Sequence, residues 1–426
     1  MQQVSKFKRT EVGQIPEDWH ILSLDDISTK IIDIDHNMPK KTESGIPFIS
    51  VGYLVNRPSY YIDIDQNDDL LEYISQKDYE HYSKRFNAEN DDVLYSRFGT
   101  IGISKLIHSK QKFIASYSVV LIKPNKNTIL PLFLNFTLNS EYLRKQAHVK
   151  TQGSSNRNLH LSDIRSLKII LPKKEEQQKI ASILSNVDEL IQKTEQIIEQ
   201  TQRLKKGVMQ RLLIKGIEHV KFKKTQVGEI PEEWELLTIS QLSKLTMGQS
   251  PSGNSYNVIG EGIPLLNGPT EFGLEYPTPT QYTTKPTKLC QNEDILLCVR
   301  GSTTGRLNLA NGTYCIGRGL ALIRGLKNKT NTKWLYYHFL RLQKYIYNIA
   351  SGGGSTFPNI NRDLIEKIII PYPTLKEQQK IASILSTIDL AIQRQQEYKL
   401  KIKNLKNGLM QQLLTGKIRV SLKNEQ

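Results

Sequence analysis

The decapeptide EQQKIASILS occurs twice in this chain of 426 residues, at 176–185 and again, unchanged, at 377–386. A second stretch is also shared. FKRTEVGQIPEDWHILSLDDIS, which begins at Phe7, and FKKTQVGEIPEEWELLTISQLS, which begins at Phe222, are identical at 11 of 22 positions. Each half therefore contains an opening motif, a divergent body and a shared tail in the same order. Such an internal duplication predicts a repeated architecture, which constrains the fold more strongly than any single residue does.

The shared tails have the periodicity of long helices. Apolar residues recur at alternating spacings of three and four over about four heptads, which is typical of a coiled coil. Pro172 and Pro373 precede the two stretches, as proline often does at helix starts. Each helix would run about 40 residues, or about 60 Å, so we favour a coiled coil over an amphipathic helix lying on one domain. The residues expected in the seam are Ile180, Ile183, Val187, Leu190, Ile197, Leu204, Ile381, Ile384, Ile388, Ala391, Ile402 and Leu405.

The order of the segments predicts how the two helices pair. The first ends near Lys215 and the second body begins near Phe222, so a compact second body would return the chain to that end. The helices would then run antiparallel, and a pseudo-twofold axis would relate the bodies. We expect an α+β fold in which two globular α/β domains are joined by an antiparallel coiled coil. The expected boundaries are 1–172 for the first domain, 173–216 for the first helix, 217–373 for the second domain, and 374–426 for the second helix and tail.

Composition narrows the class of protein. The net charge of +16 favours a polyanionic partner, of which nucleic acid is the obvious candidate. No apolar run is long enough for a membrane helix and the N-terminus has no apolar signal core, so we expect a cytoplasmic protein. The three cysteines form no C-x-x-C pair, which supports neither a disulfide framework nor a zinc site. We therefore expect no metal and no cofactor.

The repeated motifs resemble one known family. The opening motif T-x-V-G-x-I-P-x-x-W, the proline before the EQQKIASIL helix start and the second round of both are similar to the DNA specificity subunit of a type I restriction–modification system. The resemblance covers nearly the whole chain. It implies two target recognition domains, each of which reads one half of a bipartite, asymmetric DNA target. It also implies that the helices set the unspecified gap between the halves.

The resemblance further implies a non-catalytic chain that works in a larger complex. Two adenine-N6 methyltransferase subunits would be held partly by the helices, and ATP-dependent restriction subunits would complete a nuclease. The sequence agrees, because it has no Pro-Pro dipeptide for a methyltransferase motif and no G-x-x-x-x-G-K-[ST] phosphate loop. The alternatives are a free-standing DNA-binding regulator, a coiled-coil scaffold for proteins, and a restriction enzyme in a single chain. The regulator needs no long rod, the scaffold has no use for divergent loop-rich bodies, and the enzyme lacks its motifs.

Candidate DNA contacts come from three kinds of segment in each body. They are a glycine-flanked turn after an apolar strand, the end of the next strand, and a loop rich in small hydroxyls and amides near the end of the body. Arg, Lys, Asn, Ser and Thr on exposed loops can contact phosphates or base edges, although plain turns and an exposed strand arginine are the alternatives. The repeated Trp19 and Trp234 are expected to be packing residues. In the first body the candidates are Arg97, Thr100, Lys105, Asn156, Arg157 and Asn158. In the second body they are Arg300, Ser302, Thr303, Thr304, Arg306, Arg318, Ser355, Thr356 and Asn359.

Overall fold

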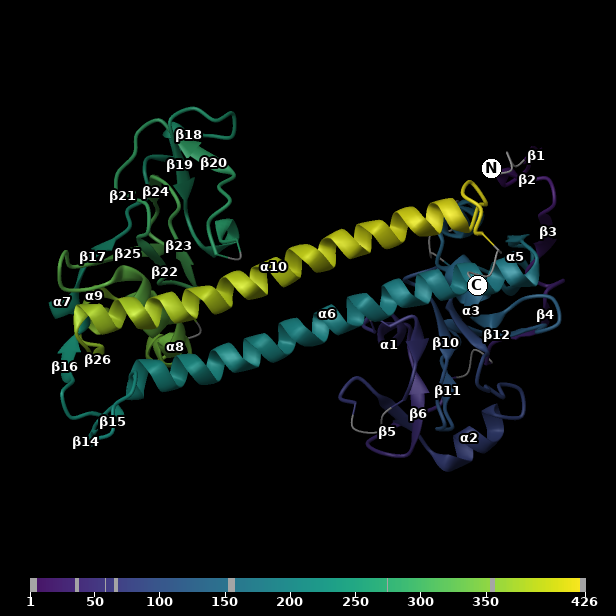
Figure 1. Cartoon of the computed structure of the whole chain (residues 1–426), viewed down its shortest axis with the longest axis horizontal. Coiled ribbons are helices and arrows are strands. Elements are labelled where there is room, and N and C mark those ends of the chain that lie inside the picture. The colour runs from purple at the N-terminus through teal and green to yellow at the C-terminus, as the bar shows by residue number, and fades with distance from the viewer. Residues whose placement is uncertain are drawn as a thin grey trace. The chain divides into compact units, whose positions relative to one another are not determined.

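The computed structural model describes residues 6–34, 38–57, 59–64, 68–151, 158–273, 275–352 and 357–421. The chain divides into two compact units. The first consists of Met1–Ile197 and Gln395–Gln426, and the second of Ile198–Arg394. The long helices α6 (Lys174–Lys215) and α10 (Leu375–Leu413) each contribute one part to either unit (Figure 1). Within the described residues, no helix combines the length and the apolar character needed to cross a bilayer.

The first unit combines β-sheets with short helices. Its strands are β1 (Phe7–Thr10), β2 (Gly13–Pro16), β3 (His20–Ser23), β4 (Ser28–Ile32), β5 (Lys41–Thr42), β6 (Ile46–Ile49), β7 (Tyr61–Ile62), β8 (Glu72–Ile74), β9 (Val93–Ser96), β10 (Ser104–Ile107), β11 (Ile114–Ala115), β12 (Val119–Pro124) and β13 (Lys168–Leu171). Its short helices are α1 (Val51–Val55), α2 (Gln76–Tyr82), α3 (Pro131–Leu138), α4 (Glu141–Lys150) and α5 (Leu161–Arg165). In the described residues, one sheet has the order β4-β12-β9-β10-β7 and another has the order β11-β6-β8-β5. The pairs β1–β2 and β13–β3 form separate ladders.

The second unit has a related plan. Its strands are β14 (Phe222–Thr225), β15 (Gly228–Pro231), β16 (Glu235–Thr238), β17 (Ser243–Met247), β18 (Tyr256–Asn257), β19 (Ile263–Leu266), β20 (Gln281–Thr283), β21 (Leu289–Cys290), β22 (Ile295–Cys298), β23 (Leu307–Leu309), β24 (Tyr314–Ile316), β25 (Leu320–Gly325) and β26 (Ile369–Tyr372). Its helices are α7 (Ile239–Leu242), α8 (Thr332–Ala350) and α9 (Arg362–Glu366), with 3₁₀ turns η1 (Gly253–Ser255) and η2 (Pro269–Glu271). The sheet β17-β25-β22-β23 corresponds to β4-β12-β9-β10 of the first unit, and β16–β26 corresponds to β3–β13. The predicted α+β fold with an internal repeat is confirmed.

The repeated Glu-Gln-Gln segment anchors each long helix to its domain. Gln177 accepts a hydrogen bond from the Leu130 backbone N–H at 2.8 Å and donates one to the Pro172 carbonyl at 2.9 Å. Gln378 likewise accepts one from the Asn331 N–H at 2.9 Å and donates one to the Pro373 carbonyl at 3.0 Å. Both glutamine side chains are buried, where an unpaired amide is costly. The decapeptide therefore recurs because each helix start must satisfy the same buried polar contacts.

Each domain core includes residues of both long helices. In the first unit, Ile180 and Leu184 of α6 pack in one cluster with Leu413 of α10. In the second unit, Leu213 of α6 and Leu385 of α10 share the equivalent cluster. Since apolar burial is the main favourable term in folding, the ends of both helices are fixed by the domains on which they lie.

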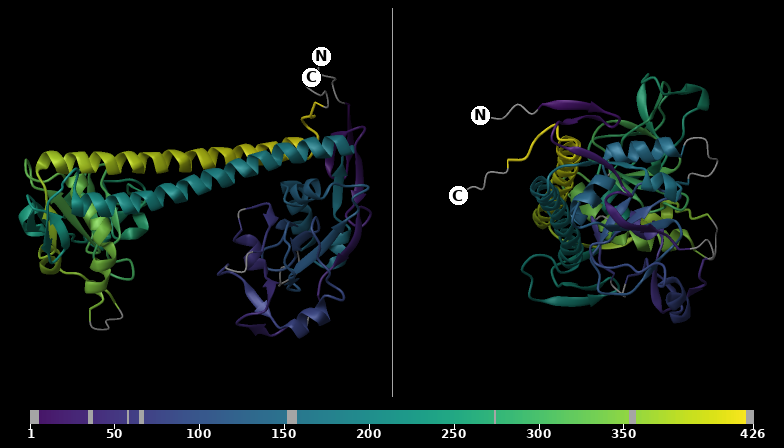
Figure 2. Two further views of the ribbon diagram at one scale, coloured as in Figure 1. Left: turned by 60° about the horizontal axis from the view of Figure 1, so that its bottom comes forward. Right: turned by 90° about the vertical axis from the view of Figure 1, so that its right-hand side faces the viewer.

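Within each unit the two helices run antiparallel. In the first unit, Asp188 pairs with Lys406 at 2.6 Å and Glu195 pairs with Lys399, so the partner number falls as the residue number rises. Both views in Figure 2 show α10 in yellow beside α6 in teal in this unit. In the second unit, Lys205 pairs with Asp389, and the Ile217 N–H donates to Glu377 at 3.0 Å. The predicted antiparallel pairing is therefore present in both units.

The predicted seam is wrong at every second position. Ile180, Ile381 and Ile402 are buried, and Val187 and Ile388 are half-buried, as a seam requires. Ile183 is half-buried as well. Six other predicted residues are exposed instead: Leu190, Ile197, Leu204, Ile384, Ala391 and Leu405. The residue after each of these is buried or half-buried: Ile191, Ile198, Lys205, Leu385, Ile392 and Lys406.

The seam thus follows a 4-3 spacing where the sequence predicted a 3-4 spacing. Ile197 and Ile198 show why the prediction failed. Adjacent apolar residues fit two neighbouring stripes of one helix equally well, so the local pattern cannot choose between them. Packing against the domain and the second helix selects the buried stripe. The other stripe leaves apolar side chains exposed.

Candidate nucleic-acid interface

The predicted turn of the first unit joins β9 to β10. Gly99 and Gly102 have φ angles of 72° and 86°, a left-handed conformation that favours glycine. Thr100 lies between them and is exposed. The turn therefore presents its backbone and Thr100 to solvent, as a loop that contacts another molecule would.

Arg97 does not lie on the exposed part of this turn, so the expectation of an exposed Arg97 is wrong. Its guanidinium forms an ion pair with Asp33 at 2.9 Å, and its Nε donates to the Tyr117 carbonyl at 2.8 Å. Both charged side chains are more than nine-tenths buried. In this conformation Arg97 fixes the loops around it and does not face a ligand.

Lys105 is also buried, against expectation. Its ammonium donates to the Arg57 carbonyl at 2.6 Å and to the Ser59 carbonyl. Burial lowers the pKa of Lys105 to about 8, and the positive charge of Lys406 acts in the same direction. Lys105 therefore joins β10 to the backbone of Arg57 and Ser59.

The equivalent turn of the second unit joins β22 to β23. Gly301 and Gly305 have φ angles of 83° and 90°. Arg300, Ser302 and Thr303 are exposed, as predicted for candidate DNA contacts. This turn therefore presents a guanidinium and two hydroxyls.

Two further candidates in this turn differ in their surroundings. Thr304 is buried, and its hydroxyl donates to the Gly301 carbonyl at 2.8 Å and to the Pro358 carbonyl at 3.3 Å. It therefore holds the turn, and the expectation of an exposed Thr304 is wrong. Arg306 is exposed, although its guanidinium donates to the Phe272 carbonyl at 3.2 Å.

The predicted loop near the end of each body lies beside the glycine turn. Asn158 forms an isolated bridge with Phe98, and Asn359 forms one with Arg300. Asn359 is exposed, whereas Asn158 is half-buried and its Oδ1 has no hydrogen-bond partner among the described residues. The structure thus brings these two predicted segments together in each unit. The other candidates of these loops lie outside the described residues: Asn156, Arg157, Ser355 and Thr356.

Arg318 lies in the third predicted segment, between β24 and β25. It is exposed, and its backbone N–H donates to the Ser250 hydroxyl at 3.1 Å. A Cβ on Gly317 would lie 2.5 Å from the Asn267 Oδ1, and one on Gly319 would lie 2.4 Å from the Asn267 carbonyl oxygen. Only glycine fits on either side of Arg318 without displacing Asn267. The backbone that carries Arg318 is therefore closely held.

Backbone hydrogen bonds show which residues of the two units are equivalent. The Arg97 N–H donates to the Ser118 carbonyl, and the Val299 N–H donates to the Gly319 carbonyl, both at 2.9 Å. The Leu159 N–H then donates to Arg97, as the Ile360 N–H donates to Val299. Arg97 therefore corresponds to the buried Val299 and not to Arg300.

Arg97 and Arg300, the arginines predicted as DNA contacts in the two turns, are therefore not equivalent positions. The counterpart of Arg300 is Phe98, since both form the bridge described above and both precede the left-handed Gly99 or Gly301. A slip of one residue in an extended segment exchanges its two faces, which is why Arg97 points inward. Alignment on the glycines in R-F-G and V-R-G would have revealed this from the sequence.

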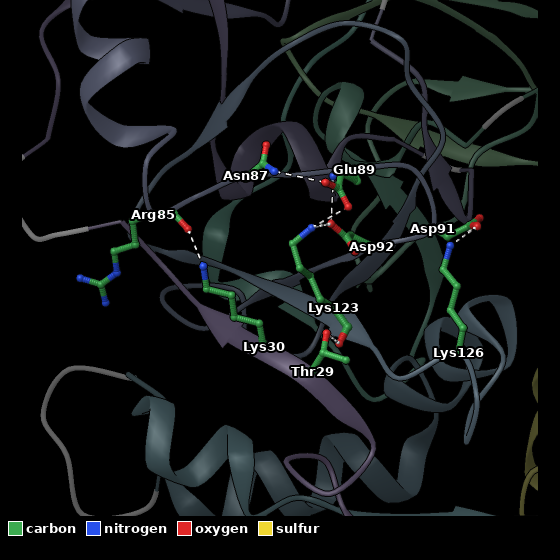
Figure 3. A network of polar contacts seen from close by, with 9 residues as sticks. All are labelled: Thr29, Lys30, Arg85, Asn87, Glu89, Asp91, Asp92, Lys123 and Lys126. Atoms are coloured by element: carbon green, nitrogen blue, oxygen red, sulfur yellow. Dashed lines mark hydrogen bonds and ion pairs between the residues drawn. The ribbon is translucent and has the colours of Figure 1, made fainter.

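An ion-pair network fixes the start of β9 against β12 (Figure 3). Lys123 donates to Asp92 at 2.8 Å and to Glu89 at 3.1 Å. Burial raises the pKa of Asp92, while the hydrogen bond from Lys123 lowers it. In the second unit Asp294 and Arg324 occupy the same places and share two hydrogen bonds. Both units therefore brace the strand that leads into the glycine turn.

A basic groove of 690 Å³ beside Thr100 was not predicted from the sequence. Arg144, Lys145 and His148 of α4 line it and are exposed. Glu141 also lines the groove and pairs with Lys145 at 2.7 Å. The basic residues of EYLRKQAHVK could have indicated a binding surface from the sequence. A charged helix face, however, usually contacts only solvent. Its place beside the glycine turn is what makes the groove a candidate for phosphate contacts.

Comparison with known proteins gives consistent results. The model of the type I restriction modification DNA specificity domain matches residues 16–203 and 231–404. The putative type I restriction enzyme MjaX specificity subunit of Methanocaldococcus jannaschii is 37% identical over 428 residues, which cover 97% of each chain. A chain from a solved structure of the type I R-M system covers 95% of this chain and 99% of its own, with 21% identity and a TM-score of 0.61. The S subunit from M. genitalium, with 16% identity, covers 96% of this chain and 99% of its own at a TM-score of 0.57. These two structures share the fold of this chain.

Proposed function

We infer that the two units of this chain read the two parts of one bipartite DNA target, because the chain belongs to the family of type I restriction–modification DNA specificity subunits. One observation carries the inference. Both units build the same braced glycine turn, and yet the exposed side chains on it differ. Such a pair can bind two different half-sites with one architecture.

The proposed DNA contacts are the exposed members of the predicted set. Thr100 in the first unit offers a hydroxyl to base edges or phosphates. The second unit offers hydroxyl, guanidinium and amide groups from Arg300, Ser302, Thr303, Arg306, Arg318 and Asn359. The basic groove on α4 would add phosphate contacts, which position the protein without reading sequence.

We assign residues 1–172 and 217–373 to the two recognition domains, and 173–216 and 374–426 to the helical spacer. The helices α6 and α10 are proposed to set the gap between the half-sites, because each is packed into both domain cores. The target is therefore asymmetric in sequence, with two short specified parts and an unspecified gap.

The chain is proposed to act with partner subunits in the cytoplasm. Two adenine-N6 methyltransferase subunits would bind along the helices, and ATP-dependent restriction subunits would complete the nuclease. The repeated exposed apolar residues support two equivalent docking faces, since Leu204 on α6 and Leu405 on α10 are 60% and 57% exposed at matching positions. Catalysis is assigned to these partners.

Selection of bound duplexes from a random library tests this function. The purified chain would be assembled with its methyltransferase partner and the bound DNA sequenced. We expect two short, different motifs at one fixed gap. A single contiguous motif, or enrichment by base composition alone, would contradict the proposal and favour a protein scaffold.

A further inference from the structure

The two units present different chemistry at one equivalent place. Phe98 corresponds to Arg300 through the bridges to Asn158 and Asn359. The segment that follows β11 corresponds to the segment that follows β24, because the Val119 N–H donates to the Ser116 carbonyl just as the Leu320 N–H donates to the Gly317 carbonyl. Tyr117 is therefore the counterpart of Arg318. At this place the first unit has two aromatic residues and the second has two arginines.

The aromatic pair is partly packed. The ring centroids of Phe98 and Tyr117 lie 6.0 Å apart, and both residues are half-buried. Phe98 has no hydrogen-bonding group on its side chain, and Tyr117 has a single hydroxyl. The first unit therefore offers mainly carbon surface here.

The arginine pair is exposed and available. Among the described residues, neither the Arg300 nor the Arg318 guanidinium has a hydrogen-bond or ion-pair partner. The two lie on adjacent segments, because the Val299 N–H before Arg300 donates to the Gly319 carbonyl after Arg318. An isolated surface arginine usually extends into water, but two arginines on adjacent, closely held segments can bind one ligand together.

The backbone under both arginines is held in place. Gly317 and Gly319 pack against Asn267 so closely that no side chain fits, and the Gly301 N–H donates to the Pro358 carbonyl at 2.8 Å. A side chain that reads a base edge must extend from a rigid backbone, because its donors have to match the acceptors of one base. A phosphate contact tolerates a more flexible backbone. The braced turn favours base reading.

We propose that Arg300 and Arg318 read guanine in the half-site of the second unit, a proposal that rests on the proposed function. An arginine donates two parallel hydrogen bonds to the O6 and N7 atoms of guanine in the major groove, a pattern that no other base offers. Among the described residues, the first unit has Phe98 and Tyr117 in place of the two arginines and offers mainly an apolar contact there. A guanine preference that depends on this pair of positions is therefore expected only in the second half-site.

The test compares selected DNA motifs for the wild-type complex and for the double variant Arg300→Lys with Arg318→Lys. Lysine keeps the positive charge but lacks the rigid planar fork that aligns two parallel hydrogen bonds with the guanine edge. We expect the wild type to select guanine at one or two positions of one half-site. In the double variant this preference should fall about 10- to 100-fold at those positions. The other half-site should stay unchanged and serves as an internal control in the same duplexes.

Variants that remove the charge separate base contacts from phosphate contacts. Arg300→Ala and Arg318→Ala should each relax one position of the same half-site. If they weaken binding to all sequences equally and only reduce the salt dependence, both arginines contact phosphates and the inference is wrong. It is also wrong if the wild type selects two motifs and the lysine variant leaves both intact. A wild-type complex that selects no two-part motif would overturn the proposed function itself, and this inference with it.

Discussion

The indole N–H of Trp19 donates to the buried carboxylate of Glu176 at 3.0 Å. The same contact joins Trp234 to Glu377 at 3.1 Å. Both tryptophans are almost completely buried, as expected of packing residues. The opening motif and the repeated decapeptide therefore meet in each unit, which explains why these two stretches are the ones that both halves keep.

Replacing Trp19 with phenylalanine should lower the free energy of unfolding by about 1.5–3 kcal/mol, because the buried carboxylate of Glu176 loses a donor. Urea unfolding of the purified chain measures this. The matched variant Trp234→Phe should have a similar effect. A change below about 0.5 kcal/mol in both would show that these indole hydrogen bonds do not contribute to stability.

The C-terminal segment should become less tightly bound at low pH. Arg419 donates to Asp18 at 2.8 Å and 3.0 Å, and these hydrogen bonds lower the pKa of Asp18. A carboxyl whose pKa is lower in the folded state stabilises it above the unfolded pKa of about 3.9, and this stability is lost as the pH falls through the folded value. Arg419→Ala should therefore destabilise the chain near pH 7, with a difference that shrinks below about pH 4. Urea midpoints at several pH values test this, and a constant difference would argue against the pair.

The two lysine–aspartate pairs between the helices should differ in strength. Asp188 is 6% exposed, and burial raises its pKa, whereas Asp389 is 28% exposed and also accepts a hydrogen bond from Tyr337. Lys406→Ala leaves a buried charge without its partner and should cost about 3–5 kcal/mol. Lys205→Ala should cost about 1 kcal/mol. Equal urea midpoints for the two variants would contradict the role assigned to burial.

Single substitutions on the exposed helix stripe should change the stoichiometry of the complex. A charge at Leu204 or Leu405 would have to be buried at the proposed docking faces. Leu204→Glu and Leu405→Glu should each give a complex with one methyltransferase subunit, and the double variant should bind none. Native mass measurement of the co-expressed subunits reports this. Gln202→Glu, on the opposite side of the same helix from Leu204, is the control and should bind two. An unchanged stoichiometry in the double variant would place the docking faces elsewhere.

Inserting one heptad into both α6 and α10 should lengthen the gap between half-sites. Seven residues add about 10 Å of helix, which corresponds to about three base pairs. Sequencing of selected duplexes should show both motifs unchanged at the longer gap. A constant gap, or an altered motif, would refute the spacer role of the helices.

Local patterns in the amino-acid sequence predict the architecture. Repeated letters, heptad periodicity and segment order predicted two related α+β domains, two long helices and their antiparallel direction. These properties follow from local patterns, since the period of the apolar residues defines a helix and a duplicated sequence must build a duplicated fold.

Which faces are buried depends on tertiary packing. Ile197 and Ile198 are both apolar, and the choice between them came from packing against the rest of the fold. Arg97 lies in a turn that the sequence marks as exposed, but its guanidinium is drawn inward by Asp33, 64 positions earlier in the chain. Burial is a non-local property that depends on what the fold brings to a residue. For this reason Arg300 is exposed and Arg97 is buried, although both are arginines next to a glycine turn and both were predicted to be exposed.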